Sequence, residues 1–279
     1  MIPDWDVNSV FLANLLQVCH AELFTELIYI LKTHEVKVRL LHNVKDIWSR
    51  DYCPIQISLG EWLQFRYEPD YLKNYPELRT DRQVADQFRK LGKCHHSTIN
   101  IDGGNVVASR NKAILTDKIY RENPSWDRPV LRDELRNLLQ VDQLIIIPKE
   151  PYDPVGHADA IVRFISEDTV LLNNYAEIDP LYGNRVANIL HRHGLKTELL
   201  PYFIEQQSVN GIPSALGLYA NFLRTSKVII VPAFGTESDQ IVLNRLISLI
   251  NDVPIVLLDC KQLAREGGIL NCICASYLL

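Results

Sequence analysis

Four short segments of the chain combine side chains that can do chemistry with tight backbone turns. They read "KDIWSRDYCP" at residues 45–54, "NIDGGNVV" at 100–107, "DPVGHADAIVRF" at 153–164 and "AREGGILNCICAS" at 264–276. Taken singly, each has an ordinary structural explanation, such as a surface ion pair, a hairpin turn, a strand hydrogen bond or a small core residue. Taken together, they supply a thiol, an imidazole and several carboxylates, each beside a glycine or a strand end.

That set fits chemistry on a guanidinium group. Paired carboxylates bind the planar cation through parallel hydrogen bonds, and a thiolate can attack its central carbon to form a covalent adduct. A histidine would protonate the departing nitrogen, which leaves as ammonia, and would then deprotonate the water that releases the product. Carboxylates around an empty site disfavour the thiolate, so we expect the bound cation to activate the nucleophile.

The elements that must position these groups form a repeating pattern. Hydrophobic spacing predicts helices at residues 10–33, 81–91, 129–140, 180–193 and 239–250. Runs of β-branched residues predict strands that begin at residues 36, 53, 97, 105, 144, 160, 169, 227 and 254. Two or three strands and a helix recur about five times, which is typical of radially repeated units whose loops meet near an axis. No linker divides the chain, so residues 1–279 are expected to form one domain.

Two of the segments contain pairs of functional residues spaced two apart. His157 and Asp159 stand at the start of a predicted strand, so their side chains are expected on one face. A glycine turn is expected to lead into a strand that carries Cys272 and Cys274, again on one face. From the residues alone, these cysteines are open to four uses: buried strand residues, half of a metal site, a redox pair, or a nucleophile with a bystander.

Composition narrows the class of protein. With 47% hydrophobic and 23% charged residues, the chain is expected to be a globular protein with a sizeable core. The formal charge of −5 and the lack of a basic cluster argue against a nucleic-acid partner, and we expect none. The N-terminus lacks the pattern of a signal peptide, and no apolar run reaches the roughly 20 residues of a membrane helix. We therefore expect a cytoplasmic protein with no membrane association, whose cysteines are thiols.

The four segments, in this order, resemble one enzyme family. The motifs RDxxP, DGGN, GHxD and GGxLNC are similar to those of the agmatine deiminase and bacterial peptidylarginine deiminase-like family of guanidino-modifying enzymes. Residues 217–235 also resemble the segment between the family's His and Cys motifs, and the resemblance spans residues 45–279. It implies an α/β fold of the pentein superfamily, a five-bladed α/β propeller with pseudo-fivefold symmetry. No cofactor and no metal are expected.

Matched motif by motif, the resemblance implies roles for individual residues. Cys272 would be the nucleophile and His157 the general acid and base, with Asp51 and Asp159 clamping the guanidinium nitrogens. Asp102 stands where the agmatine enzymes have Glu. The expected substrate-binding residues are Asp102, Trp48, Arg50, Gly103, Gly268 and Asn271.

Several departures mark a short-chain subgroup. Asn271 stands where agmatine enzymes commonly have His, and Cys274 where Thr is common. The N-terminal segment is shorter, and "FRYEPDYL" at 65–72 is a signature of the subgroup. We interpret Cys274 as a packing substitute for Thr.

The resemblance implies a hydrolytic deiminase with a small cationic guanidino substrate. The first expectation is conversion of agmatine and water to N-carbamoylputrescine and ammonia through a covalent Cys thiouronium intermediate. Free arginine or peptidyl-arginine, giving citrulline, are alternatives, and Arg66 or Arg163 could pair with the α-carboxylate of free arginine. A homo-oligomer is possible.

Three further alternatives belong to other classes. An amidinotransferase would share the covalent intermediate, and a non-catalytic binding protein could share the fold. A zinc site could use ligands drawn from Cys94, His95, His96, Cys260, Cys272 and Cys274. Structural zinc sites prefer cysteine knuckles on turns, and the sequence has no second knuckle.

Overall fold

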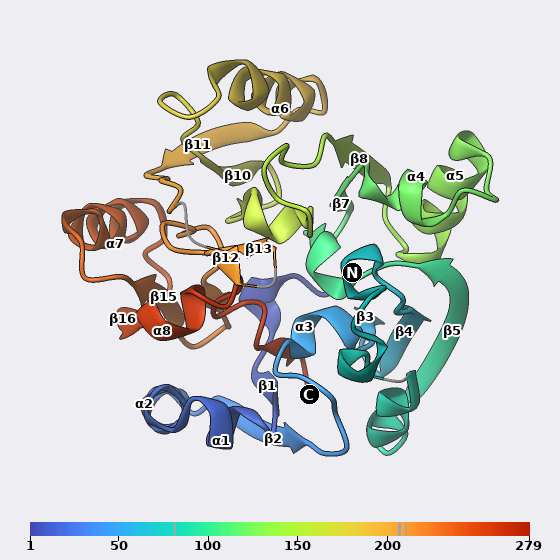
Figure 1. The fold of residues 1–279 in the computed structure, drawn as a ribbon, viewed down its shortest axis with the longest axis horizontal. Helices are drawn as coiled ribbons and strands as arrows, with labels where there is room; N and C mark the ends of the chain where they lie inside the picture. The colour runs from blue at the N-terminus through green and yellow to red at the C-terminus, as the bar shows by residue number, and fades with distance from the viewer. Residues whose placement is uncertain (81, 206–207, 210) are drawn as a thin grey trace.

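The computed structural model describes residues 1–80, 82–205, 208–209 and 211–279. Within these residues, five three-stranded sheets surround a common centre, and the longer helices lie at the periphery (Figure 1). In each sheet the middle strand pairs antiparallel with one neighbour and parallel with the other. The same local pattern therefore recurs five times along the described chain.

The strands of each sheet are close in sequence, except in the sheet that joins the two ends of the chain. That sheet consists of β17, β1 and β2 (Ala275–Tyr277, Ser9–Ala13, Lys37–Leu41). The others consist of β3, β4 and β5 (Ile55–Ser58, Glu61–Arg66, Lys93–Asn100), β6, β7 and β8 (Val107–Ala108, Lys112–Thr116, Gln143–Ile147), β9, β10 and β11 (Val162–Phe164, Thr169–Asn173, Lys196–Leu200), and β14, β15 and β16 (Leu223–Arg224, Ile229–Ala233, Ile255–Asp259).

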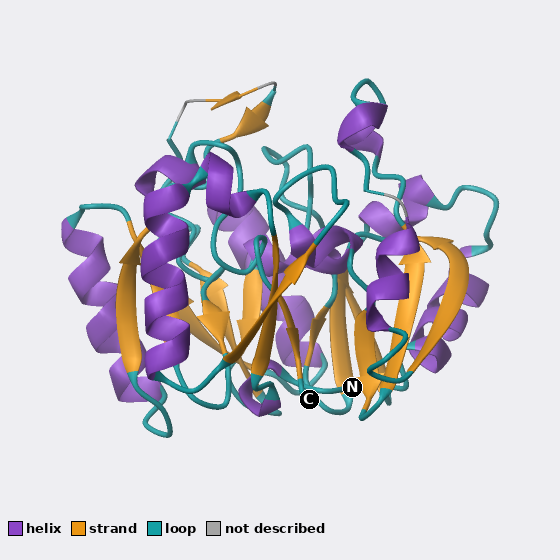
Figure 2. Ribbon diagram, turned by 90° about the horizontal axis from the view of Figure 1, so that it is seen from below, coloured by secondary structure: helices purple, strands orange, loops and turns teal. Residues whose placement is uncertain are grey.

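A small hairpin stands apart from these sheets. Its strands are β12 (Ser208–Val209) and β13 (Ile212–Pro213). Figure 2 shows it at one face of the molecule, while the two chain ends lie at the opposite face.

The α-helices differ widely in length. They are α1 (Leu16–Cys19), α2 (Ala21–Thr33), α3 (Ser49–Tyr52), α4 (Lys118–Glu122), α5 (Arg128–Leu138), α6 (Pro180–Arg192), α7 (Glu237–Leu249) and α8 (Lys261–Ala264). The 3-10 turns are Asp4–Asp6, Asp70–Leu72, Pro76–Leu78, Arg82–Phe88, Gly103–Asn105 and Ala158–Ala160. Helix α7 begins with a capping box between Thr236 and Asp239, which satisfies backbone groups that a helix start leaves unpaired. The hydrophobic core lies between the sheets and the peripheral helices.

Three predicted helices are confirmed as α5, α6 and α7, each within two residues at its ends. The helix predicted at 10–33 is wrong at its start, because residues 9–13 form β1, which is fully buried between β17 and β2. Periodicity cannot separate such an apolar run from a buried helix. The helix predicted at 81–91 is wrong in type, because Arg82–Phe88 is a 3-10 helix, and residue 81 lies outside the described residues.

The predicted strands all overlap observed ones, but six of the nine begin one or two residues later than expected. A 3-10 turn accounts for two of these shifts. The strand predicted from residue 105 is reduced to Val107–Ala108, because Gly103–Asn105 is a 3-10 turn. The strand predicted from residue 160 begins at Val162, after the turn Ala158–Ala160. None of the helices in the described ranges combines the length and the apolar character that a membrane crossing requires. The cytoplasmic location stays a prediction.

Candidate active site

Cys272, His157 and Asp159 line one cavity of about 250 Å³. Each comes from a segment that precedes a strand: Cys272 precedes β17, and the other two precede β9. Ser208 and Pro213 of the small hairpin also line the cavity, which places it toward the face opposite the chain ends (Figure 2). His157 and Cys272, which are 115 residues apart in sequence, thus line the same cavity, as the motifs predict.

The thiol of Cys272 is half-buried and donates to Oδ1 of Asn221 at 3.4 Å. Burial raises its pKa well above the usual value, and the negative charges of Asp159 and Asp51 raise it further. In the empty site the group is therefore a thiol at neutral pH. A bound cation would oppose the carboxylates and favour the thiolate.

The prediction that Cys272 and Cys274 share one face of a strand is wrong. Strand β17 begins only at Ala275, and both cysteines lie in the turns before it, so strand alternation does not apply. Cys274 is fully buried in the hydrophobic core, and burial raises the pKa of its thiol to about 12. Cys274 is absent from the described lining of the cavity.

The cysteines of the described residues are all free thiols. Among residues 1–80, 82–205, 208–209 and 211–279, no three His, Cys, Asp or Glu side chains are grouped so that they could hold a metal ion.

His157 lies between two carboxylates. Its Nε2 is 2.7 Å from Oδ2 of Asp102, and its Nδ1 is 3.5 Å from Oδ1 of Asp51. Burial alone would lower the pKa of His157, but the two carboxylates outweigh burial and raise the pKa to about 9. The imidazole is therefore charged at neutral pH and can donate a proton.

His157 and Asp159 both line the cavity, but the prediction that they share one face of a strand is wrong. His157 is the residue before the 3-10 turn Ala158–Ala160, and Asp159 lies within that turn. Their placement thus follows from a turn and not from strand alternation.

Asp51 is held by the backbone of the turn that carries the two glycines. The backbone N–H of Gly104 donates to Oδ1 of Asp51 at 3.0 Å. A Cβ atom at residue 104 would lie 2.6 Å from that oxygen and 2.6 Å from Nδ1 of His157, so only glycine fits there. Burial raises the pKa of Asp51 to about 7, although the charge of His157 opposes this shift.

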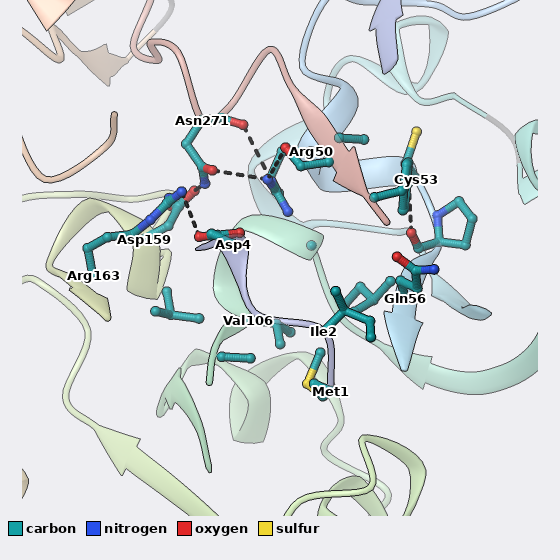
Figure 3. A pocket seen from close by; sticks show the side chains of 18 residues that line it. Met1, Ile2, Asp4, Arg50, Cys53, Gln56, Val106, Asp159, Arg163 and Asn271 are labelled. Atoms are coloured by element: carbon teal, nitrogen blue, oxygen red, sulfur yellow. Dashed lines mark hydrogen bonds and ion pairs between the residues drawn. The ribbon is translucent and has the colours of Figure 1, made fainter. Parts of the chain in front are cut away.

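Two successive hydrogen bonds, from Arg50 to Asn271 and from Asn271 to Asp159, position Asp159. Asn271 donates from Nδ2 to Oδ2 of Asp159 at 2.5 Å, and Nη2 of Arg50 donates to Oδ1 of Asn271 at 3.1 Å (Figure 3). Burial raises the pKa of Asp159. Its Oδ1 is buried and has no hydrogen-bond partner within the described part of the chain.

Asp102 lies behind His157 and is completely buried. Its Oδ2 accepts from Nζ of Lys118 as well as contacting His157. Nζ of Lys118 also lies 2.9 Å from Oε1 of Glu122, so the lysine sits between two buried carboxylates. Burial would raise the pKa of Asp102, but Lys118 and His157 outweigh it and lower the pKa to about 2.

The residues expected to bind substrate lie around the site but do not belong to the described lining of the cavity with Cys272. These are Asp102, Trp48, Arg50, Gly103, Gly268 and Asn271. The two glycines allow close packing: a Cβ at Gly103 would lie 2.0 Å from the carbonyl oxygen of Arg50, and one at Gly268 would lie 2.5 Å from the ring of Trp48. Contact between these residues and a substrate stays a prediction.

The wall of the cavity beyond the cysteine is acidic and partly apolar. Glu150, Asp153 and Glu205 line it, together with side chains such as Leu216 and Leu218. Oε2 of Glu205 is buried and, among the described residues, lacks a hydrogen-bond partner. The described lining contains no Lys or Arg.

Neither arginine proposed to pair with an α-carboxylate is among the described lining residues of this cavity. Arg66 is half-exposed and pairs with Glu68. Arg163 lines a second cavity of about 50 Å³ and pairs with Asp4 at 2.7 Å (Figure 3).

Known proteins share both the sequence pattern and the fold. Relatives named as agmatine deiminases in Legionella pneumophila and Lactococcus lactis are each 24% identical, over 268 and 286 residues. These alignments cover 87% and 86% of this chain, and 75% and 76% of the relatives.

Solved structures show the same fold. A C. jejuni agmatine deiminase with substrate bound has a TM-score of 0.80 at 16% identity, covering 100% of this chain and 96% of that one. A structure of DDAH from Pseudomonas aeruginosa has a TM-score of 0.63 at 11% identity, covering 98% of this chain and 100% of that one. The chain thus has the α/β fold of these pentein-type enzymes.

The sequence profile of one family covers nearly the whole chain. The profile described as Porphyromonas-type peptidyl-arginine deiminase matches residues 13–277. The match therefore includes all four motifs, but only the last residue of β1. The chain belongs to the Porphyromonas-type peptidyl-arginine deiminase family.

Proposed function

We propose that this protein is a hydrolytic deiminase of a small cationic guanidino compound, with agmatine as the first choice. The products would be N-carbamoylputrescine and ammonia. The observation that carries the proposal is the convergence of Cys272, His157 and Asp159 on one acidic cavity. The names of the similar proteins support the same reaction: "putative agmatine deiminase" for the two sequence relatives, and agmatine deiminase for the C. jejuni structure.

We also propose that residues 1–279 form a single catalytic domain, whose five three-stranded sheets are the blades of a five-bladed propeller with pseudo-fivefold symmetry. The repeated strand pairing of the five sheets supports this interpretation. The reaction proposed below needs no cofactor. A homo-oligomer stays a prediction.

The substrate would enter with its guanidinium group between Asp159 and Asp51. Oδ1 of Asp159 lacks a partner within the described residues and can accept from a guanidinium nitrogen. The incoming cation favours the thiolate of Cys272, whose thiol proton is released on binding. The sulfur then forms a bond to the central carbon and gives a tetrahedral adduct.

His157 would serve both halves of the reaction. As an imidazolium it gives its proton to one nitrogen of the adduct, the C–N bond breaks, and ammonia leaves behind a thiouronium bound to Cys272. The neutral imidazole then takes a proton from water, which attacks the same carbon. Cleavage of the C–S bond, with loss of the hydroxyl proton to solvent, releases the ureido product and returns the thiolate with a protonated His157.

The acidic wall favours agmatine over free arginine. A terminal ammonium would be attracted by Asp153 and Glu205, and by the ionised form of Glu150, whose pKa burial raises to about 7, whereas an α-carboxylate would be repelled. The described lining provides no Lys or Arg to pair with a carboxylate. Deimination of free arginine to citrulline is therefore the less favoured alternative.

The test is a panel of agmatine, arginine, a methylated arginine and an arginine peptide, assayed for ammonia and ureido product. We expect agmatine to exceed the others in kcat/KM by about three decades, since specificity is expressed in that ratio. Cys272→Ala should abolish turnover. Equal activity of Cys272→Ala and the wild type, or no turnover of any member, would refute the proposal.

A further inference from the structure

Lys118 is a buried lysine that the reaction above does not use. It is the first residue of α4, its side chain is completely inaccessible, and its Nζ lies between Oδ2 of Asp102 and Oε1 of Glu122. The Nζ atom is also 5.1 Å from the centre of the Tyr71 ring. A lysine is almost never buried without partners, and here it has two carboxylates and an aromatic ring.

Lys118 reaches the reacting atoms only through Asp102. It is absent from the described lining of the cavity with Cys272, so it makes no substrate contact there. The path runs from Nζ of Lys118 to Oδ2 of Asp102, and from that same oxygen to Nε2 of His157 at 2.7 Å. The other oxygen of Asp102 has no partner within the described residues. Lys118 and His157 are thus the two side chains that hold this carboxylate.

The electrostatic balance around Asp102 depends on the lysine. A fully buried carboxylate destabilises the fold unless it is paired. Lys118 and His157 both lower the pKa of Asp102, and the charge of Lys118 has the larger effect of the two charges. Glu122 is also buried, and burial raises its pKa to about 7 although Lys118 opposes this. The charged groups around His157 include Asp51 as well as Asp102. Without Lys118, Asp102 would keep one ionic partner and would be free to turn.

We propose, on the basis of the deiminase function above, that Lys118 is a positioning residue for the reaction. It holds Asp102 so that Oδ2 stays on Nε2 of His157, and the imidazole stays directed at the leaving nitrogen. Lys118 itself transfers no proton and touches no substrate.

The direct test is Lys118→Met, which keeps the length of the side chain and removes its charge. We expect kcat to fall about 10- to 100-fold, because general acid catalysis contributes about 10²- to 10⁴-fold and a misdirected imidazole loses part of it. KM should change by less than about threefold, because the cavity wall is intact. Arg121→Met is the matched control. Arg121 lies on the same helix and pairs with Asp70, but its side chain is half-exposed and takes no part in the contacts from Lys118 through Asp102 to His157. It should leave kcat unchanged.

Removing Lys118 alone takes its positive charge away from two buried carboxylates. The single variant could therefore fail to fold. The double variant Lys118→Met/Glu122→Gln removes the lysine together with one of these charges and avoids the problem. Its stability is checked by its denaturant midpoint. We expect the folded double variant to show the same loss of kcat.

NMR of His157 supplies a readout that does not depend on turnover. In the wild type and in Arg121→Met, the proton on Nε2 should give a downfield resonance that is protected from exchange, because Nε2 is 2.7 Å from Asp102. Lys118→Met and the double variant should lose it. Full kcat, or an unchanged resonance, in the folded double variant overturns the proposal. If the wild type converts no guanidine, the proposed function fails on its own, and the resonance still tests Lys118.

Discussion

Gly104 offers a sharp test of the site, because its missing side chain leaves room for two catalytic groups. In Gly104→Ala, the new Cβ would lie 2.6 Å from Oδ1 of Asp51 and 2.6 Å from Nδ1 of His157. An ordinary contact begins at 3.4 Å, so each of the two groups must move away from the new Cβ by about 0.8 Å. Both are buried, which leaves them little freedom to move elsewhere.

A shift of this size should be costly for catalysis. A misplacement of about 1 Å can cost on the order of 10²-fold in rate, and we expect kcat/KM for the preferred guanidine to fall by about that factor. The assay is steady-state ammonia release, with circular dichroism and thermal unfolding to confirm that the variant is folded.

Gly194→Ala is the control for the general effect of replacing a glycine. Gly194 has φ +76°, and a Cβ there would meet nothing within 4 Å. Alanine is strained in that conformation, so this variant should lose about 1 kcal/mol of stability and keep full activity. A folded Gly104→Ala protein with kcat/KM within about threefold of the wild type would refute the assignment of Asp51 and His157 to the reacting site.

Two further predictions concern the nucleophile and the pH profile. Cys272→Ser should abolish turnover, whereas Cys274→Ser should keep most of it, because Cys274 lies in the core; equal losses in two folded variants would point back to a joint role of the thiols. The pKa of Asp51 is raised to about 7 and that of His157 to about 9. Asp51 must be ionised to bind the cation and His157 protonated to donate, so kcat/KM should rise through about pH 7 and fall through about pH 9. A profile that is flat between pH 6 and 10 would contradict these roles.

The four motifs predicted which residues meet, but not the local structure that brings them together. Cys272, His157 and Asp159 line one cavity as expected, although strand alternation positions none of them. Turns determine their directions, and turn geometry depends on tertiary contacts that a single sequence does not display. Likewise, Ser9–Ala13 has the composition of a buried helix, and its pairing with β17 decides that it is a strand.

The parts of the site that sequence reasoning missed carry weak local signals. Lys118 lies outside the predicted helices and strands as an ordinary charged residue, and nothing beside it marks a buried ion pair with Asp102, 16 residues earlier. The recurrence of strands and helices about five times was easier to foresee than the sheets themselves, because β4, β7 and β11 were not predicted.

The protonated thiol of Cys272 has a consequence for how the protein meets reactive compounds. Oxidants and alkylating agents attack the thiolate, so a protein at rest, with no cation in its cavity, should be a poor target for them. A covalent inhibitor that carries a positive charge would itself favour the thiolate of Cys272 when it binds. Selectivity among such compounds should therefore depend on the placement of the charge relative to the electrophilic carbon more than on the intrinsic reactivity of that carbon.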